Sequence, residues 1–76
     1  MNQQQLVSLV SVIAIKNNIV ISNVKSNTDV KVYSVDGKLV KALEINADIN
    51  FNLHPGIWIV KIKDNDGEKS IKVVSN

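Results

Sequence analysis

Apolar and polar residues alternate over short stretches along most of this chain. Because successive side chains of a strand point to opposite faces, this period of two predicts β-strands. Val and Ile dominate the apolar residues, and their branching at Cβ favours a pleated sheet over a helix. We therefore predict strands at Leu9–Ile15, Asn18–Ser22, Asp29–Val35, Lys38–Leu43, Ile49–Phe51, Ile57–Lys63 and Lys69–Val74.

The amino-terminal segment fits two patterns. The apolar residues of Gln3–Ile13 also suit one face of a helix, so strand and helix both stay open there. The apolar run Leu6–Ile15 is well short of the ~20 residues that a membrane-spanning helix needs. No lysine or arginine precedes it, so it does not resemble a signal peptide. We expect no integral membrane segment, and either a cytoplasmic chain or a fragment of an exported protein.

The pair Asp36-Gly37 predicts a first hairpin, because tight turns need a positive φ, which glycine adopts freely and aspartate tolerates. We favour a three-residue loop, Val35–Gly37, with a bulge, over a two-residue loop that would place Val32 opposite Lys41. The favoured register pairs Val32 with Val40 and Val30 with Ala42.

The pair Asp66-Gly67 predicts a second hairpin on the same grounds. A turn centred on this pair gives both strands one shared apolar face, to which Trp58 adds. It also sets two lysines against each other on the opposite face, which is mildly unfavourable. The predicted pairs are Ile62 with Ile71, Val60 with Val73, and Lys61 with Lys72.

The stretch HPGIWIVKI places Pro55 and Gly56 directly before a run that is apolar on both faces. Proline cannot donate to a ladder and glycine frees the backbone, so the pair should start a strand. A strand that is apolar on both faces is usually central or covered.

We expect Trp58 and Tyr33 to pack in the core, since buried aromatic side chains contribute large apolar areas. Regularly spaced short strands indicate an antiparallel β-sandwich.

The composition limits the classes of function. A chain of 76 residues forms one domain with a thin core, and it has no cysteine for disulfides or thiolate metal sites. Nine basic residues, all lysines, are spread along the sequence against seven acids. Nucleic-acid-binding surfaces usually cluster their cations and favour arginine. We predict no nucleic-acid partner.

Few residues are candidates for chemistry. His54 is the only histidine, which excludes a two-histidine metal site and leaves a turn histidine as the better interpretation. The acidic residues of Asp64–Glu68 suggest a calcium-binding loop. However, Gly67 is the fourth residue of this segment, whereas an EF-hand loop needs glycine at position 6. No phosphate-binding glycine loop and no nucleophile elbow is present. We predict no enzyme, metal or cofactor.

Two motifs resemble the C-terminal sorting domain of the type IX secretion system of Bacteroidetes. The first is VKVYSVDGKLV, in which a V-x-V-Y strand precedes a turn glycine, Gly37. The second is L-x-x-G-x-Y followed by alternating Val or Ile, matched by Leu53, Gly56 and Trp58, with tryptophan in place of tyrosine. A final strand with Lys72 before Val73 completes the resemblance, which extends from about Asn18 to Val74.

The resemblance implies an Ig-like β-sandwich that is recognised by an outer-membrane translocon and has no catalytic role. It also implies protein partners and a secreted or cell-surface location. The domain would span residues 1–76, with 1–17 as an amino-terminal strand or arm and 18–74 as the core. Candidate partner-binding residues are Lys69, Lys72, Val73 and Val74, and residues with a structural role in turns or core are Gly37, Gly56, Trp58 and Gly67.

A second hypothesis belongs to another class. A stand-alone small structural subunit, such as a decoration or connector protein of a phage virion, could use the same sandwich. Its apolar amino-terminal strand would then pair with a neighbouring chain, since an exposed apolar edge is costly.

Overall fold

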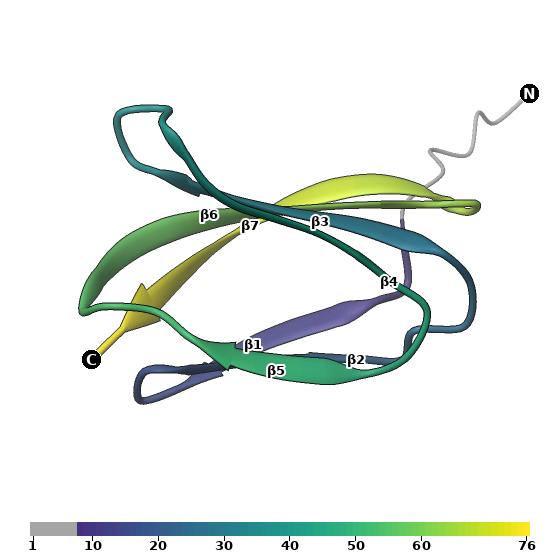
Figure 1. Cartoon of the computed structure of the whole chain (residues 1–76), viewed down its shortest axis with the longest axis horizontal. Helices are drawn as coiled ribbons and strands as arrows, with labels where there is room; N and C mark the ends of the chain where they lie inside the picture. Colours follow the sequence, from purple (N-terminus) through teal and green to yellow (C-terminus); the bar gives the residue numbers. More distant parts are fainter. Residues whose placement is uncertain (1–7) are drawn as a thin grey trace, which may run out of the picture.

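The computed structural model describes residues 8–76, which form seven strands (Figure 1). All seven predicted strands are present, with bounds that differ from the prediction by no more than two residues. The strands are β1 (Ser11–Ile15), β2 (Asn18–Ser22), β3 (Thr28–Ser34), β4 (Leu39–Ile45), β5 (Ile49–Asn52), β6 (Gly56–Asp64) and β7 (Gly67–Ser75).

The strands form two antiparallel sheets that pack face to face, which confirms the predicted β-sandwich (Figure 1). The smaller sheet has the order β1-β2-β5 and the larger sheet has the order β4-β3-β6-β7. The predicted central strand is central, because β6 lies between β3 and β7.

The core lies between the sheets and consists mainly of Val and Ile from alternate positions. Ile19 and Ile21 of β2 are fully buried, as are Val30 and Val32 of β3. β6 adds Val60 and Ile62 to the same layer. Fully burying one such side chain stabilises the fold by about 1.5–3 kcal/mol, so the period of two in the sequence is the main determinant of this fold.

The first hairpin has the predicted three-residue loop, since the N–H of Ser34 donates to the carbonyl of Lys38 over 2.9 Å. Gly37 closes the loop with φ +89°. The predicted pairs further along the hairpin are wrong, because the register shifts between Val32 and Tyr33. This bulge leaves Val40 without a partner. The observed pairs are Tyr33 with Leu39, Val32 with Lys41, and Val30 with Leu43.

The predicted register of the second hairpin is wrong by two residues. The loop is Asn65-Asp66, and Gly67 opens β7 with φ +137° instead of lying in the turn. The Asp64 carboxylate fixes this loop by accepting the N–H of Asp66 over 2.9 Å. A shift of two keeps every side chain on its predicted face. The observed pairs are Trp58 with Val73, Val60 with Ile71, and Ile62 with Lys69, while Lys61 lies opposite Ser70 and not Lys72.

The amino-terminal part of the described chain is a strand and not a helix. β1 pairs with β2, and Val10 and Val12 enter the core. The helical alternative over Gln3–Ile13 falls partly on residues 1–7, which lie outside the described residues. Within residues 8–76, no helix is long and apolar enough to cross a membrane.

Ser8 attaches the start of this segment to the β6–β7 hairpin. Its hydroxyl is buried, donates to Asp64 Oδ2 over 2.7 Å and accepts the N–H of Val10 over 3.1 Å. The segment from Ser8 onward is therefore part of the folded sandwich.

Candidate functional site

The last strand, β7, contains the four candidate partner-binding residues. It is an edge strand of the larger sheet and pairs with β6. The alternation of the strand places Lys72 and Val74 on the exposed outer face of the sheet, whereas Val73 is buried in the core. Lys69 is half-buried on the inner side, opposite Ile62. Only two of the four candidates therefore share an accessible surface.

The outer face of the larger sheet is apolar on one side of Lys72. Cross-strand pairing aligns Leu39, Tyr33, Ile59 and Lys72 in one row over the four strands, and Ile57 and Val74 form the next pair. Ile57 and Val74 are each about half exposed, at 46% and 54%. We call these residues the outer patch: Tyr33, Leu39, Ile57, Ile59, Lys72 and Val74.

The other end of this outer face is charged. Lys63 lies between Asp29 and Glu68 in one row across the sheet. In the next row Lys31 lies opposite Lys61, so the like-charge pair of this face is not the predicted one. Opposite charges around Lys63 are typical of a solvated surface. The outer patch is thus a distinct apolar area at one end of the sheet.

The predicted structural residues lie where the chain turns or begins a strand. Gly56 opens β6 with φ +149°, a backbone conformation that side chains with a Cβ rarely adopt. Trp58 is half-buried against the core, and its indole Nε1–H donates to the carbonyl of His54 over 2.9 Å. This hydrogen bond closes the turn around Pro55, so Trp58 holds the start of β6 in place. Tyr33 packs on the outer face instead of in the predicted core position.

The loop of the first hairpin contains an acid whose pKa departs from its ordinary value. The Ser34 hydroxyl donates to Asp36 Oδ1. This hydrogen bond is the main cause that lowers the pKa of the fully exposed Asp36 carboxyl below 3.8. The Asp36 side chain therefore helps to fix the conformation of the first hairpin loop.

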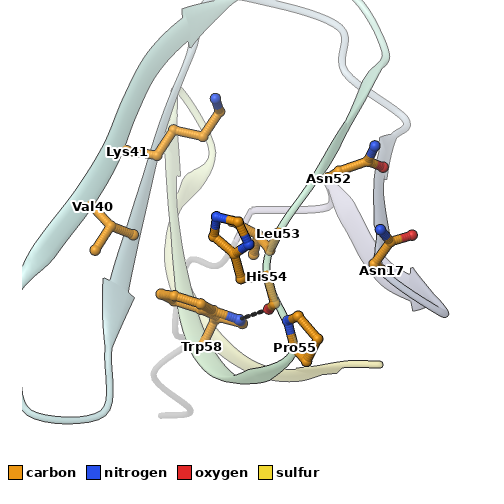
Figure 2. A pocket seen from close by; sticks show the side chains of 8 residues that line it. All are labelled: Asn17, Val40, Lys41, Asn52, Leu53, His54, Pro55 and Trp58. Atoms are coloured by element: carbon orange, nitrogen blue, oxygen red, sulfur yellow. Dashed lines mark hydrogen bonds between the residues drawn. The ribbon is translucent and has the colours of Figure 1, made fainter.

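A pocket of about 430 Å³ opens at the side of the sandwich between the edge strands β4 and β5 (Figure 2). Figure 2 shows Val40 and Lys41 on one wall and Asn17 and Asn52 on the other, with the turn segment between them. Leu53, His54, Pro55 and Trp58 complete the lining.

The turn between β6 and β7 contains the acidic segment that was considered for calcium. Among residues 8–76, no group of three or more His, Cys, Asp or Glu side chains is placed to hold a metal ion. Both carboxylate oxygens of Asp64 accept hydrogen bonds, from Ser8 and from the backbone of Asp66. The segment considered for calcium is therefore engaged in forming the β6–β7 turn.

Among the motif residues, Gly37 lies in the loop of the first hairpin, and Gly56 and Trp58 lie at the start of β6. The pattern of the secretion system C-terminal sorting domain matches residues 11–76. The chain belongs to this family, and it is a C-terminal sorting domain of type IX secretion. No curated protein and no solved structure gave a significant match. The comparisons give no support to a virion subunit.

The match begins at the first residue of β1, and thus includes a strand that the sequence resemblance left out. Sequence reasoning assigned none of Val40, Lys41 and Asn17 to a pocket. Val40 belongs to the first motif, but nothing in the sequence places it near Asn17. The sequence did contain a signal for the outer-patch residues Ile57 and Ile59, because they make the outer face of a central strand apolar.

Proposed function

We propose that this sorting domain acts by binding a protein component of the type IX secretion machinery through the outer patch, with Lys72 as its charged centre. The observation that supports this proposal most strongly is the position of Lys72. It lies opposite the half-buried Ile59, and its outer-face neighbour Val74 lies opposite Ile57. The cation therefore lies at the border between the exposed apolar pair Ile57 and Val74 and the polar rows of the sheet.

An exposed apolar surface on a β-sheet favours contact with another protein. A partner surface of matching chemistry would place apolar side chains over Ile57 and Val74 and a carboxylate close to Lys72. Removing apolar area from water would supply affinity, and the ion pair would fix the orientation. The domain does no chemistry in this proposal, which agrees with a family defined by sorting.

The buried candidates contribute in another way. Val73 is 6% exposed and packs opposite Trp58, so it cannot reach a partner while the sandwich is folded. Its role is to hold β7 in the register that presents Lys72 and Val74. The half-buried Lys69 lies opposite Ile62 and faces away from the outer patch.

A reporter fusion tests this proposal. Residues 8–76 are placed behind a signal peptide and a reporter in a type IX-competent host. The fusion begins at Ser8 because this residue and Val10 are buried in the sandwich. We expect the reporter at the cell surface, and we expect Lys72→Ala to reduce the surface signal severalfold. Deleting residues 69–76 should abolish export, but this deletion also removes most of β7.

Lys31→Ala is the matched control, because Lys31 is exposed on the same outer face but in its charged half. Thermal unfolding of both purified variants checks that the fold is kept. Export that is unchanged in Lys72→Ala, or reduced equally in the two folded variants, would contradict the proposed role of the outer patch.

A further inference from the structure

The pocket between β4 and β5 is shaped by a β-bulge. Neighbouring residues of a strand normally point to opposite faces. Val40 and Lys41 are neighbours in β4, yet both line the pocket, because the register shift leaves Val40 without a cross-strand partner. Bulges re-aim side chains in this way, and they are frequent next to functional sites.

The ammonium group of Lys41 is held at this pocket. Its side chain starts from the inner face of β4, opposite the buried Val32, and its Nζ lies 5.2 Å from the centre of the Phe51 ring of β5. A cation above an aromatic face is attracted by the ring quadrupole. Lys41 therefore reaches from one sheet toward the other, and its side chain lines the pocket.

The side chains that line the pocket include a positive charge and no negative charge. None of the eight residues that line it is acidic, and Lys41 supplies a positive charge. The exposed imidazole of His54 lies on the Lys41 side of the pocket, and the amides of Asn17 and Asn52 lie on the opposite wall (Figure 2). The pocket thus has a cation and no acidic side chain, which is the chemistry that receives a carboxylate.

The remaining lining is apolar and fixed in place. The Trp58 ring is held by its hydrogen bond to the carbonyl of His54, and this turn also places Pro55 and Leu53 at the pocket. Val40 faces them from β4. A ligand that fits this lining needs an apolar group next to its carboxylate.

We propose that this pocket binds an extended peptide segment in which an acidic side chain lies next to an apolar one. The carboxylate would approach Lys41, and the apolar side chain would lie between Val40 and Trp58. β4 and β5 are both sheet edges, so the backbone of an extended segment could lie along the mouth of the pocket. This site lies on a different surface from the outer patch, and it does not depend on the role of Lys72.

Peptide titration of the whole 76-residue chain tests this inference. The probes are acetyl-TVELT-amide, its neutral match acetyl-TVQLT-amide, and sodium acetate. The chemical shifts of the Trp58 indole N–H and of the Asn17 and Asn52 side-chain amides report on the pocket. We expect saturable shifts with the acidic peptide, about tenfold weaker binding of the neutral peptide because a charge-assisted hydrogen bond is lost, and weaker binding of acetate than of either peptide.

Lys41→Gln keeps most of the side-chain stem but removes the charge, and it should reduce binding of the acidic peptide to the level of the neutral one. Lys31→Gln, on the outer face, should leave binding unchanged. The comparison of the two peptides on the unaltered chain needs no variant, so it stands even if Lys41→Gln weakens the fold. Equal binding of both peptides, acetate binding as tightly as the acidic peptide, or no saturable binding would overturn the proposal.

Discussion

The adjacent valines of β7 allow a sharp test of how this strand is built. Val73 is 6% exposed and belongs to the core, whereas Val74 is 54% exposed on the outer face. Val73→Ala removes two buried methyl groups, at about 0.8 kcal/mol each. The cavity left behind adds to this, for a total loss of about 2–3 kcal/mol in the free energy of unfolding.

In a domain of this size, a loss of 1 kcal/mol lowers Tm by roughly 4–8 °C. Val73→Ala should therefore lower Tm by roughly 10–20 °C in a thermal unfolding experiment followed by circular dichroism. Val74→Ala is the matched control, and it should change stability by about 0.5 kcal/mol at most, as exposed substitutions usually do. Equal shifts for the two variants, or a larger one for Val74→Ala, would refute the placement of β7.

Three further predictions concern other parts of the sandwich. Gly56→Val should destabilise the fold by about 1–3 kcal/mol in urea unfolding, because φ is +149° there, whereas the exposed Lys25→Ala should stay within about 0.5 kcal/mol; equal midpoints would contradict this. Ser8→Ala should cost about 1–2 kcal/mol through its two lost hydrogen bonds, and a cost no greater than that of the exposed Ser11→Ala would contradict it. The lowered pKa of Asp36 stabilises the fold above its unfolded pKa, and this contribution is lost as the pH falls through the folded pKa, so Asp36→Asn should flatten the fall of Tm below about pH 4; an unchanged slope would contradict it.

Most of the fold could be predicted from local pattern. The alternation of Val and Ile located every strand, and β2 has the predicted bounds, because burial on one face of a strand imposes a period of two. The Pro55-Gly56 pair starts β6 as expected. These features depend on residues that are close in the sequence.

The hairpin registers show what local pattern does not determine. A turn at Asp66-Gly67 and the observed turn at Asn65-Asp66 bury the same faces, so hydrophobicity alone cannot choose between them. The choice depends on the Asp64 carboxylate, which accepts the N–H of Asp66. In the first hairpin the loop was predicted correctly, but the bulge at Val40 lies beyond it and changes every later pair.

The candidate surfaces likewise depend partly on local sequence pattern and partly on the packing of the sheets. Lys72 and Val74 could be assigned to the final strand from motif order, but only the sheet register places them beside Ile57 and Ile59. The pocket could not be predicted, because it combines β4 with the β1–β2 turn and the segment after β5. Residues brought together by sheet packing leave no signal at a fixed spacing.

The most direct measurement compares surface delivery of a reporter fused to residues 8–76 in two otherwise identical hosts, one with and one without a functional type IX system. The reporter carries a signal peptide in both hosts, and protease accessibility on intact cells separates surface from periplasm. A sorting domain predicts a surface reporter only in the competent host, and a periplasmic reporter in the other. A folded fusion that stays in the periplasm of the competent host, or that reaches the surface equally in both, would contradict the account.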